Sequence, residues 1–214
     1  MPTSCGPLLS SLLKSLPSNP VYPIYASTWR WFFISLITFP LAYYRQQTNS
    51  IKWPRNRRPD PLPDLGASHL PNIRRFKVLQ DLFPLVAVMV TRNYDMFFRL
   101  YGSCILLRFI FFNSTILPPP DKDFPQLRMS LGVIPNFDFD LIFSGHTMTV
   151  LVAAATFAVD PTPDATQWMI FCILLALLCS FSLIAMREHY TIDVLVAWLA
   201  TYACYKYHEH EYRE

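Results

Sequence analysis

Two short polar stretches, 143–147 and 187–193, hold the side chains in this sequence with the clearest chemical potential. His189 and Asp193 are four residues apart, so on a helix they would share one face and the carboxylate could reach the imidazole edge. A carboxylate that holds one ring nitrogen leaves the other available to attack an electrophile or to take a proton. His146 adds a second group that titrates near neutral pH and could protonate a leaving oxygen. The two stretches therefore predict a nucleophile and a general acid.

Three other interpretations of these residues stay open at this point. The histidines could be hydrogen-bonded interfacial residues, Asp193 could cap a helix, or the three side chains could bind a metal. A metal site lacks a further ligand at metal spacing, and ionisable groups at the ends of apolar segments are costly and usually functional. We therefore expect catalysis at His146, His189 and Asp193, and no metal ion.

Long apolar segments, typical of membrane spans, must position the histidines. The six candidates are 29–44, 78–91, 96–116, 141–159, 167–186 and 190–207. Two of them separate His146 from His189, so both histidines are expected at the same membrane face. The first is short against the about 20 residues that a bilayer core needs, and 78–91 is interrupted by Asp81 and Pro84. The segment 78–91 is still taken as a span because the number of membrane crossings requires it. The sequence therefore predicts an all-α, polytopic bundle of six transmembrane helices.

The composition also favours a membrane protein. The 214 residues are 52% hydrophobic and 15% charged, whereas a soluble domain carries about 25% charged residues. The formal net charge is +3, and no basic and aromatic groove for nucleic acid is evident. The five cysteines are scattered without a Cys-x-x-Cys pair, and there is no glycine-rich nucleotide loop, so no cofactor is expected.

Three regions follow from these segments. Residues 1–28 form an N-terminal lead, 29–207 the six-span membrane domain with the catalytic groups, and 208–214 a polar tail. The tail alternates histidine and acid, which could bind a metal, but a solvated chain end is expected.

An anion-binding role is expected for Arg108, which falls late in the segment 96–116. A guanidinium there must pair or extend toward the interface, and its planar fork matches the oxygens of a phosphodiester. Contact with lipid head groups alone is the alternative. Next to His146, Ser144 and Gly145 would let the backbone come close to an anion.

Four ordered stretches resemble the motifs of the sphingomyelin synthase family, a branch of the type 2 phosphatidic acid phosphatase-like membrane enzymes. They are 61–64 (Pro-Leu-Pro-Asp), 108–120, 140–147 (Asp-Leu-Ile-Phe-Ser-Gly-His-Thr) and 189–194 (His-Tyr-Thr-Ile-Asp-Val). The sequence departs from the family where 138–139 replace Cys-Gly and where Phe111 replaces a threonine. The stretch 121–135 is also shorter than the corresponding family loop. These departures bear on head-group specificity more than on the reaction type.

The resemblance implies a two-step transfer of a head group, without metal or cofactor. His189, oriented by Asp193, would attack the phosphorus of a glycerophospholipid such as phosphatidylcholine, and His146 would protonate the departing diacylglycerol oxygen. The phosphohistidine would then react with ceramide to give sphingomyelin. The residues expected to hold the phosphate and the acceptor hydroxyl are Arg108, Asp140, Ser144 and Gly145.

The alternatives are a ceramide phosphoethanolamine or inositol phosphorylceramide synthase, a lipid phosphate phosphatase, and a non-catalytic sphingolipid-binding membrane protein. The phosphatase family has a Lys-x(6)-Arg-Pro stretch and a Ser-Arg before the last histidine, which this sequence lacks. The alternation of aromatic and acidic residues in 137–140 suits a cation. Choline or ethanolamine is therefore predicted over inositol, with choline first.

The expected partners are a phospholipid donor (phosphatidylcholine or phosphatidylethanolamine), ceramide and the membrane, with no nucleic acid; a homo-oligomer stays open. The resemblance implies cytosolic termini and an active site on the lumenal face of the Golgi or the outer face of the plasma membrane. The basic loop 46–77 argues for the reverse orientation by the positive-inside rule. The resemblance is preferred because other charged residues dilute that signal.

Overall fold

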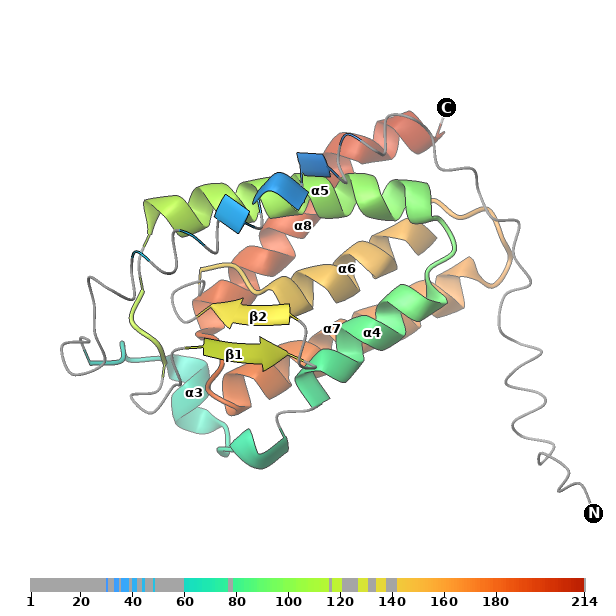
Figure 1. Cartoon of the computed structure of the whole chain (residues 1–214). Coiled ribbons are helices and arrows are strands. Elements are labelled where there is room, and N and C mark those ends of the chain that lie inside the picture. The colour runs from blue at the N-terminus through green and yellow to red at the C-terminus, as the bar shows by residue number, and fades with distance from the viewer. Residues whose placement is uncertain are drawn as a thin grey trace, which may run out of the picture.

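The protein is a bundle of helices with one small hairpin (Figure 1). The computed structural model describes residues 60–76, 79–115, 117–120, 127–130, 134–137 and 142–213, and single positions between 30 and 48. The helices are α3 (Leu65–His69), α4 (Leu79–Val90), α5 (Tyr94–Ser114), α6 (Gly145–Phe157), α7 (Ala165–Ala185) and α8 (Thr191–Arg213), with a 3-10 turn η2 (Arg74–Phe76). The strands are β1 (Leu127–Ser130) and β2 (Ile134–Phe137).

Helices α4 to α8 correspond to five of the six predicted spans, and the first, 29–44, lies largely outside the described residues. At 1.5 Å per residue, the 12 residues of α4 and the 13 of α6 extend about 18 and 20 Å, less than a bilayer core of about 30 Å. Within the described chain, only α7 is both long and apolar enough to cross a membrane, with a mean hydropathy of 2.6. The structure thus supports the helical bundle and one clear span.

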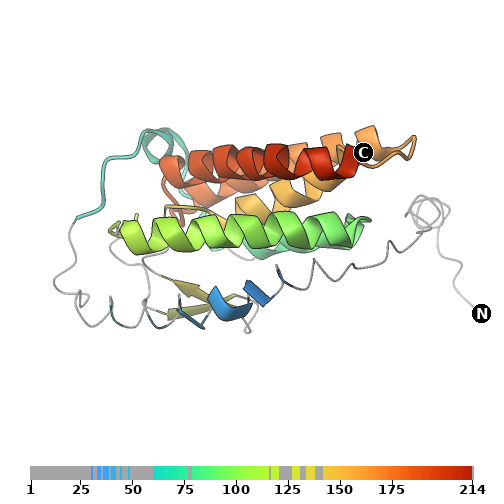
Figure 2. The same ribbon diagram turned by 90° about the horizontal axis from the view of Figure 1, so that it is seen from above.

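The prediction of an all-helical chain missed the hairpin. Strands β1 and β2 pair antiparallel, with Leu127 opposite Phe137 and Ser130 opposite Ile134. Strand β1 is only one short alternation, Leu-Arg-Met-Ser, and Pro135 inside β2 argues against a strand in the sequence. Figure 2 shows this hairpin and α8 on opposite sides of the bundle.

Helix α6 is the centre of the core. From Val150 to Ala155 its side chains are all small or aliphatic, and Val150, Val152 and Ala153 have no exposed surface. A helix that is apolar all round is stable only when other elements surround it, and in Figure 2 α6 lies between α5 and α8. By contrast, α7 presents Leu174 and Phe181 outward, both more than half exposed. Outward apolar side chains of this size suit a hydrocarbon environment.

The predicted solvated tail is wrong for its first part, because α8 continues to Arg213. His208 is 2% exposed, and its Nε2 lies 2.9 Å from the Ser103 hydroxyl of α5. This contact fastens the last turns of α8 to α5.

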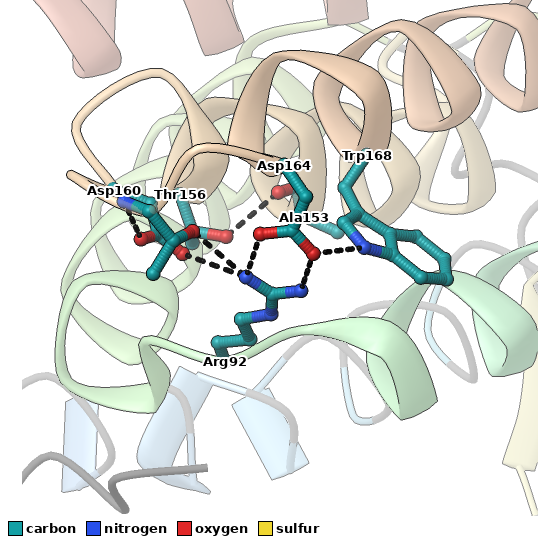
Figure 3. A network of polar contacts seen from close by, with 7 residues as sticks. Arg92, Ala153, Thr156, Asp160, Asp164 and Trp168 are labelled. Atoms are coloured by element: carbon teal, nitrogen blue, oxygen red, sulfur yellow. Dashed lines mark hydrogen bonds and ion pairs between the residues drawn. The ribbon is translucent and has the colours of Figure 1, made fainter. Parts of the chain in front are cut away.

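The two ends of the bundle differ. At one end, called here the histidine end, α4, α6 and α8 begin. At the other, called the clamp end, Arg92 links the α4–α5 connection to the turn between α6 and α7 (Figure 3). Its Nη1 donates to the Thr162 hydroxyl at 2.8 Å and to Asp164 Oδ1 at 2.9 Å, and it lies 3.8 Å from Asp160 Oδ2. Trp168 Nε1 donates to Asp164 Oδ2 at 3.1 Å. These residues form the Arg92 clamp.

Candidate active site

The two histidine motifs meet at the histidine end although α6 and α7 separate them in the chain. The backbone N–H of Ser144, at the start of α6, donates to the carbonyl of Asp193, in the first turn of α8, at 3.3 Å. Counting helices in the sequence predicts this meeting. Two helix N-termini therefore lie side by side, and each contributes a partial positive charge that favours an anion.

His189 faces Asp193, but not in the predicted way. Helix α8 begins at Thr191, so His189 precedes the helix and does not share a helical face with Asp193. Instead, Asp193 Oδ2 accepts the backbone N–H of Tyr190 at 2.8 Å, which is one half of a capping box. The same oxygen lies 3.4 Å from His189 Nδ1. Asp193, treated in the sequence as either a helix cap or a partner of the imidazole, thus caps the helix and also lies beside the imidazole.

His146 faces a carboxylate that the sequence did not assign to the site. Its Nε2 lies 3.0 Å from Oδ1 of Asp81, which stands in the first turn of α4. In the sequence Asp81 was only an interruption of the weakest span. A carboxylate inside an apolar segment is itself a signal of function, and that signal could have identified it. The site therefore holds two carboxylate–histidine pairs, one through Nδ1 of His189 and the other through Nε2 of His146.

Arg108 lies over the start of α6 because residue 145 is a glycine. A Cβ atom on Gly145 would come within 2.6 Å of Arg108 Nη1 and 3.0 Å of its Cζ. The glycine thus makes room for a guanidinium, rather than directly for an anion as the sequence suggested. The guanidinium and the positive end of α6 are like charges, so an anion beside both would stabilise the arrangement.

The two other predicted binding residues differ in what the structure says of them. Ser144 is the N-cap of α6: its fully buried hydroxyl accepts the N–H of Thr147 and donates to the Thr147 hydroxyl at 3.1 Å. This capping bond, worth about 1 kcal/mol, makes Ser144 a structural support for His146. Asp140 lies outside the described residues. Among the residues that the structure describes, no three His, Cys, Asp or Glu side chains form a group able to hold a metal ion.

The arrangement is suited to moving a phosphoryl group. Each of the two imidazoles lies beside a carboxylate, and imidazole is a side chain that can attack an electrophile or carry a proton. A guanidinium and two helix N-termini offer compensation for the phosphate charge.

Comparisons with known proteins agree with this chemistry. Residues 139–211, which contain both histidines, match the family model of the PAP2 superfamily C-terminal region. The phosphatidylinositol:ceramide inositolphosphotransferase 3 of Arabidopsis thaliana is 37% identical over 84 residues, 38% of this chain and 28% of that protein. The phosphatidylinositol:ceramide inositolphosphotransferase of Leishmania major is 28% identical over 152 residues, 64% of this chain and 43% of that protein.

A cholinephosphotransferase is also similar. The phosphatidylcholine:ceramide cholinephosphotransferase 1 of Sus scrofa is 24% identical over 222 residues, 86% of this chain and 52% of that protein. The chain thus spans about half, or less, of the length of the curated relatives it matches.

Proposed function

We propose that this member of the PAP2 superfamily transfers a phospho-head group from a glycerophospholipid to ceramide. The chain is a distant homologue of the sphingomyelin synthase and inositol phosphorylceramide synthase family. The observation that carries the proposal is the pair of carboxylate–histidine contacts at one end of the bundle, His189 with Asp193 and His146 with Asp81. The names of the relatives support ceramide as the acceptor, because each of them is a ceramide phosphotransferase.

In the first step, His189 Nε2 attacks the phosphorus of the donor lipid while Asp193 holds the other ring nitrogen. The bond from phosphorus to the diacylglycerol oxygen breaks, and His146 gives that oxygen its proton. A phosphohistidine and diacylglycerol result. Asp81, 3.0 Å from His146 Nε2, stabilises the protonated imidazole from which the proton comes.

In the second step, the primary hydroxyl of ceramide attacks the phosphohistidine. His146 removes the hydroxyl proton, the bond between phosphorus and His189 breaks, and both histidines return to their starting states. One phosphodiester replaces another, so the reaction needs no nucleotide.

Phosphate binding is assigned to Arg108 and the N-terminus of α6, where Gly145 permits their close approach. Ser144 contributes by fixing the start of that helix. The contribution of Asp140 stays a prediction from the sequence. The Arg108 guanidinium and the N-terminus of α6, placed beside the phosphodiester, would neutralise its charge in the transition state.

The proposed donor is phosphatidylcholine, on the aromatic and acidic pattern of 137–140. The relatives named above include both inositol and choline transferases, so their names do not choose between these head groups. We place the protein in the membrane as a multi-pass enzyme, in the Golgi or the plasma membrane with the site lumenal or extracellular. The apolar length of α7 supports a membrane location.

The test is a transfer assay with labelled ceramide and purified protein in lipid nanodiscs, run separately with phosphatidylcholine, phosphatidylethanolamine and phosphatidylinositol. Thin-layer separation should show labelled sphingomyelin with the first donor and no product with His189→Ala. Inositol phosphorylceramide as the main product would overturn the choice of head group. Water-soluble phosphate ester released without any labelled phosphosphingolipid would overturn the transfer itself.

A further inference from the structure

The segment 60–76 is the one motif-bearing stretch that the proposed reaction does not use. It lies across the turn between α7 and α8, and Figure 1 shows α3 beside that end of the bundle. Ile73 N donates to the carbonyl of Ala185, at the end of α7, at 3.2 Å. Arg187 Nη2 donates to the carbonyl of Leu70 at 3.1 Å. The segment is therefore bonded to the chain on the N-terminal side of His189.

A single carboxylate bonds the same segment to the chain after His189. Asp64 Oδ2 accepts the backbone N–H of Thr191 at 2.6 Å, and Oδ1 accepts the Thr191 hydroxyl at 2.7 Å. Asp64 Oδ1 also accepts the N–H of Ala67 at 2.7 Å, which caps α3. Asp64 thus supports the first turn of α3 and also that of α8, whose Thr191 is 127 residues further along the chain.

The tyrosine beside His189 is anchored by the same segment and by one further stretch of the chain. The Tyr190 hydroxyl accepts the N–H of Leu62 at 3.1 Å and donates to the carbonyl of Pro118 at 2.9 Å. Tyr190 is 3% exposed, and its bond to Pro118 is buried.

The local backbone is shaped for these contacts. A Cβ atom on Gly66 would overlap the Thr191 hydroxyl, so only glycine lets α3 come this close to α8. Arg187 has φ 60°, in the left-handed region where a helix usually ends on glycine. Its N–H donates to the carbonyl of Ile184, and the next N–H, that of Glu188, donates to Leu183. The short turn that carries His189 thus has bonded neighbours on both sides.

We infer that residues 60–76 form a brace that holds the His189 turn in its reactive position, and that Asp64 is the positioning residue at its centre. The inference rests on the proposed function for the role of His189. A nucleophile in a turn, unlike one on a helix, has no regular hydrogen-bond ladder to fix it. The brace supplies the missing constraints from a distant part of the chain, and a displacement of about 1 Å at a reacting group can cost about a hundredfold in rate.

The carboxylate state of Asp64 matters for this role. Burial by itself would raise the pKa of Asp64, but the hydrogen bonds from Ala67 and Thr191 outweigh burial and lower it. An asparagine has nearly the same shape but offers one acceptor and one donor. In one orientation its NH2 group would face the backbone N–H of Thr191 and break the bond to α8, and in the other it would face the N–H of Ala67 and break the cap of α3.

The experiment compares Asp64→Asn and Thr191→Val with two controls in the purified full chain in nanodiscs. Thr191→Ser keeps both bonds to Asp64, and Ser68→Ala removes only exposed hydroxyl contacts within α3, those with Leu65 and His69. The readouts are the rate of phosphohistidine formation per titrated site, KM for the donor, and hydrogen exchange in residues 186–195. Titrating active sites separates a slower site from a smaller folded fraction.

Asp64→Asn should slow phosphohistidine formation about 10- to 100-fold per active site with KM little changed. Exchange at 186–195 should quicken about tenfold while α5 and α6 stay as in the wild type. Thr191→Val should show a smaller loss, and the two controls should match the wild type.

Wild-type rate and exchange in Asp64→Asn would overturn the brace and leave the proposed function intact. If the wild type transfers no head group, the proposed function fails, and exchange alone decides whether the brace holds the turn. Unchanged exchange in Asp64→Asn would then refute it, and faster exchange would support it.

Discussion

The histidine end and the clamp end use similar charged groups in different ways. At the clamp end a buried guanidinium, that of Arg92, is bonded to Asp164 and lies beside Asp160. At the histidine end the carboxylates of Asp81 and Asp193 face imidazole rings instead, and imidazole is the side chain most often used as an acid or base in catalysis. The clamp end therefore joins segments of the fold, and the histidine end presents groups suited to proton transfer.

The largest expected difference between the ends is the effect of removing an imidazole. His189→Ala and His146→Ala should each lower head-group transfer by about a thousandfold or more, because one removes the proposed nucleophile and the other the proposed proton donor. The unfolding temperature should stay within a few degrees of the wild type. His210→Ala, an exposed histidine near the end of α8, is the matched control. A His189→Ala protein with substantial transfer would refute the nucleophile assignment.

The next largest effect should come from Asp81→Asn. The amide cannot stabilise a protonated His146, so transfer should fall about a hundredfold. Burst kinetics with a donor whose leaving group needs no proton should recover most of the lost rate. An equal loss with both donors would show that Asp81 acts on folding rather than on proton delivery.

Gly145→Ala should cost about 10- to 100-fold in kcat/KM for the donor, because the added methyl group displaces the Arg108 guanidinium. Arg108→Gln should give a similar loss. The double variant should be little worse than either single one, since both changes remove the same contact. Fully additive losses would mean that the two residues serve the substrate independently.

At the clamp end, Arg92→Gln should lower the stability of the fold and leave transfer nearly unchanged, the opposite of the substitutions at the histidine end. The unfolding temperature should drop by about 5 °C or more, because a buried carboxylate is left without its partner. Transfer per folded molecule should stay within about twofold of the wild type, because the change lies at the far end of the bundle. A large loss of specific activity at unchanged stability would show that the two ends are coupled.

The smallest effect concerns pH. Hydrogen bonds from Arg92 lower the pKa of Asp164 below its ordinary value of 3.8. A carboxyl whose pKa is lower in the folded state stabilises the fold above its unfolded pKa and loses this contribution as the pH falls toward the folded value. The stability difference between wild type and Arg92→Gln should therefore be constant above about pH 4 and shrink below it. Thermal unfolding across this range measures it, and a difference that grows on acidification would contradict it.

The helices and the meeting of the two histidine motifs could be predicted because each depends on a local property. Apolar length marks α4 to α8, and an even number of helices between His146 and His189 returns the chain to the same end. The hairpin was missed because its strands have only four residues each and Pro135 interrupts the second. For His189 the spacing to Asp193 was correct, but the helix starts two residues later than a shared helical face requires.

The remaining contacts of the site depend on the tertiary fold, which no local pattern encodes. Asp81 precedes His146 by 65 residues, and nothing in the sequence around Asp81 indicates that it contacts this histidine. Gly145 could be identified as a close approach, but the approaching group could not, because Arg108 comes from another helix. Asp64 likewise matched a motif, but nothing in the sequence indicated which residue it contacts.

The bond between Asp64 and Thr191 also sets an order in time. Its partners are 127 residues apart, so the bond cannot form before Thr191 has been added to the growing chain. Closing a loop of this length has an entropic cost that ordering of the intervening chain reduces. Under the proposed function, a growing chain that already holds His146 and Asp81 therefore still has no fixed nucleophile with which to attack the surrounding phospholipids.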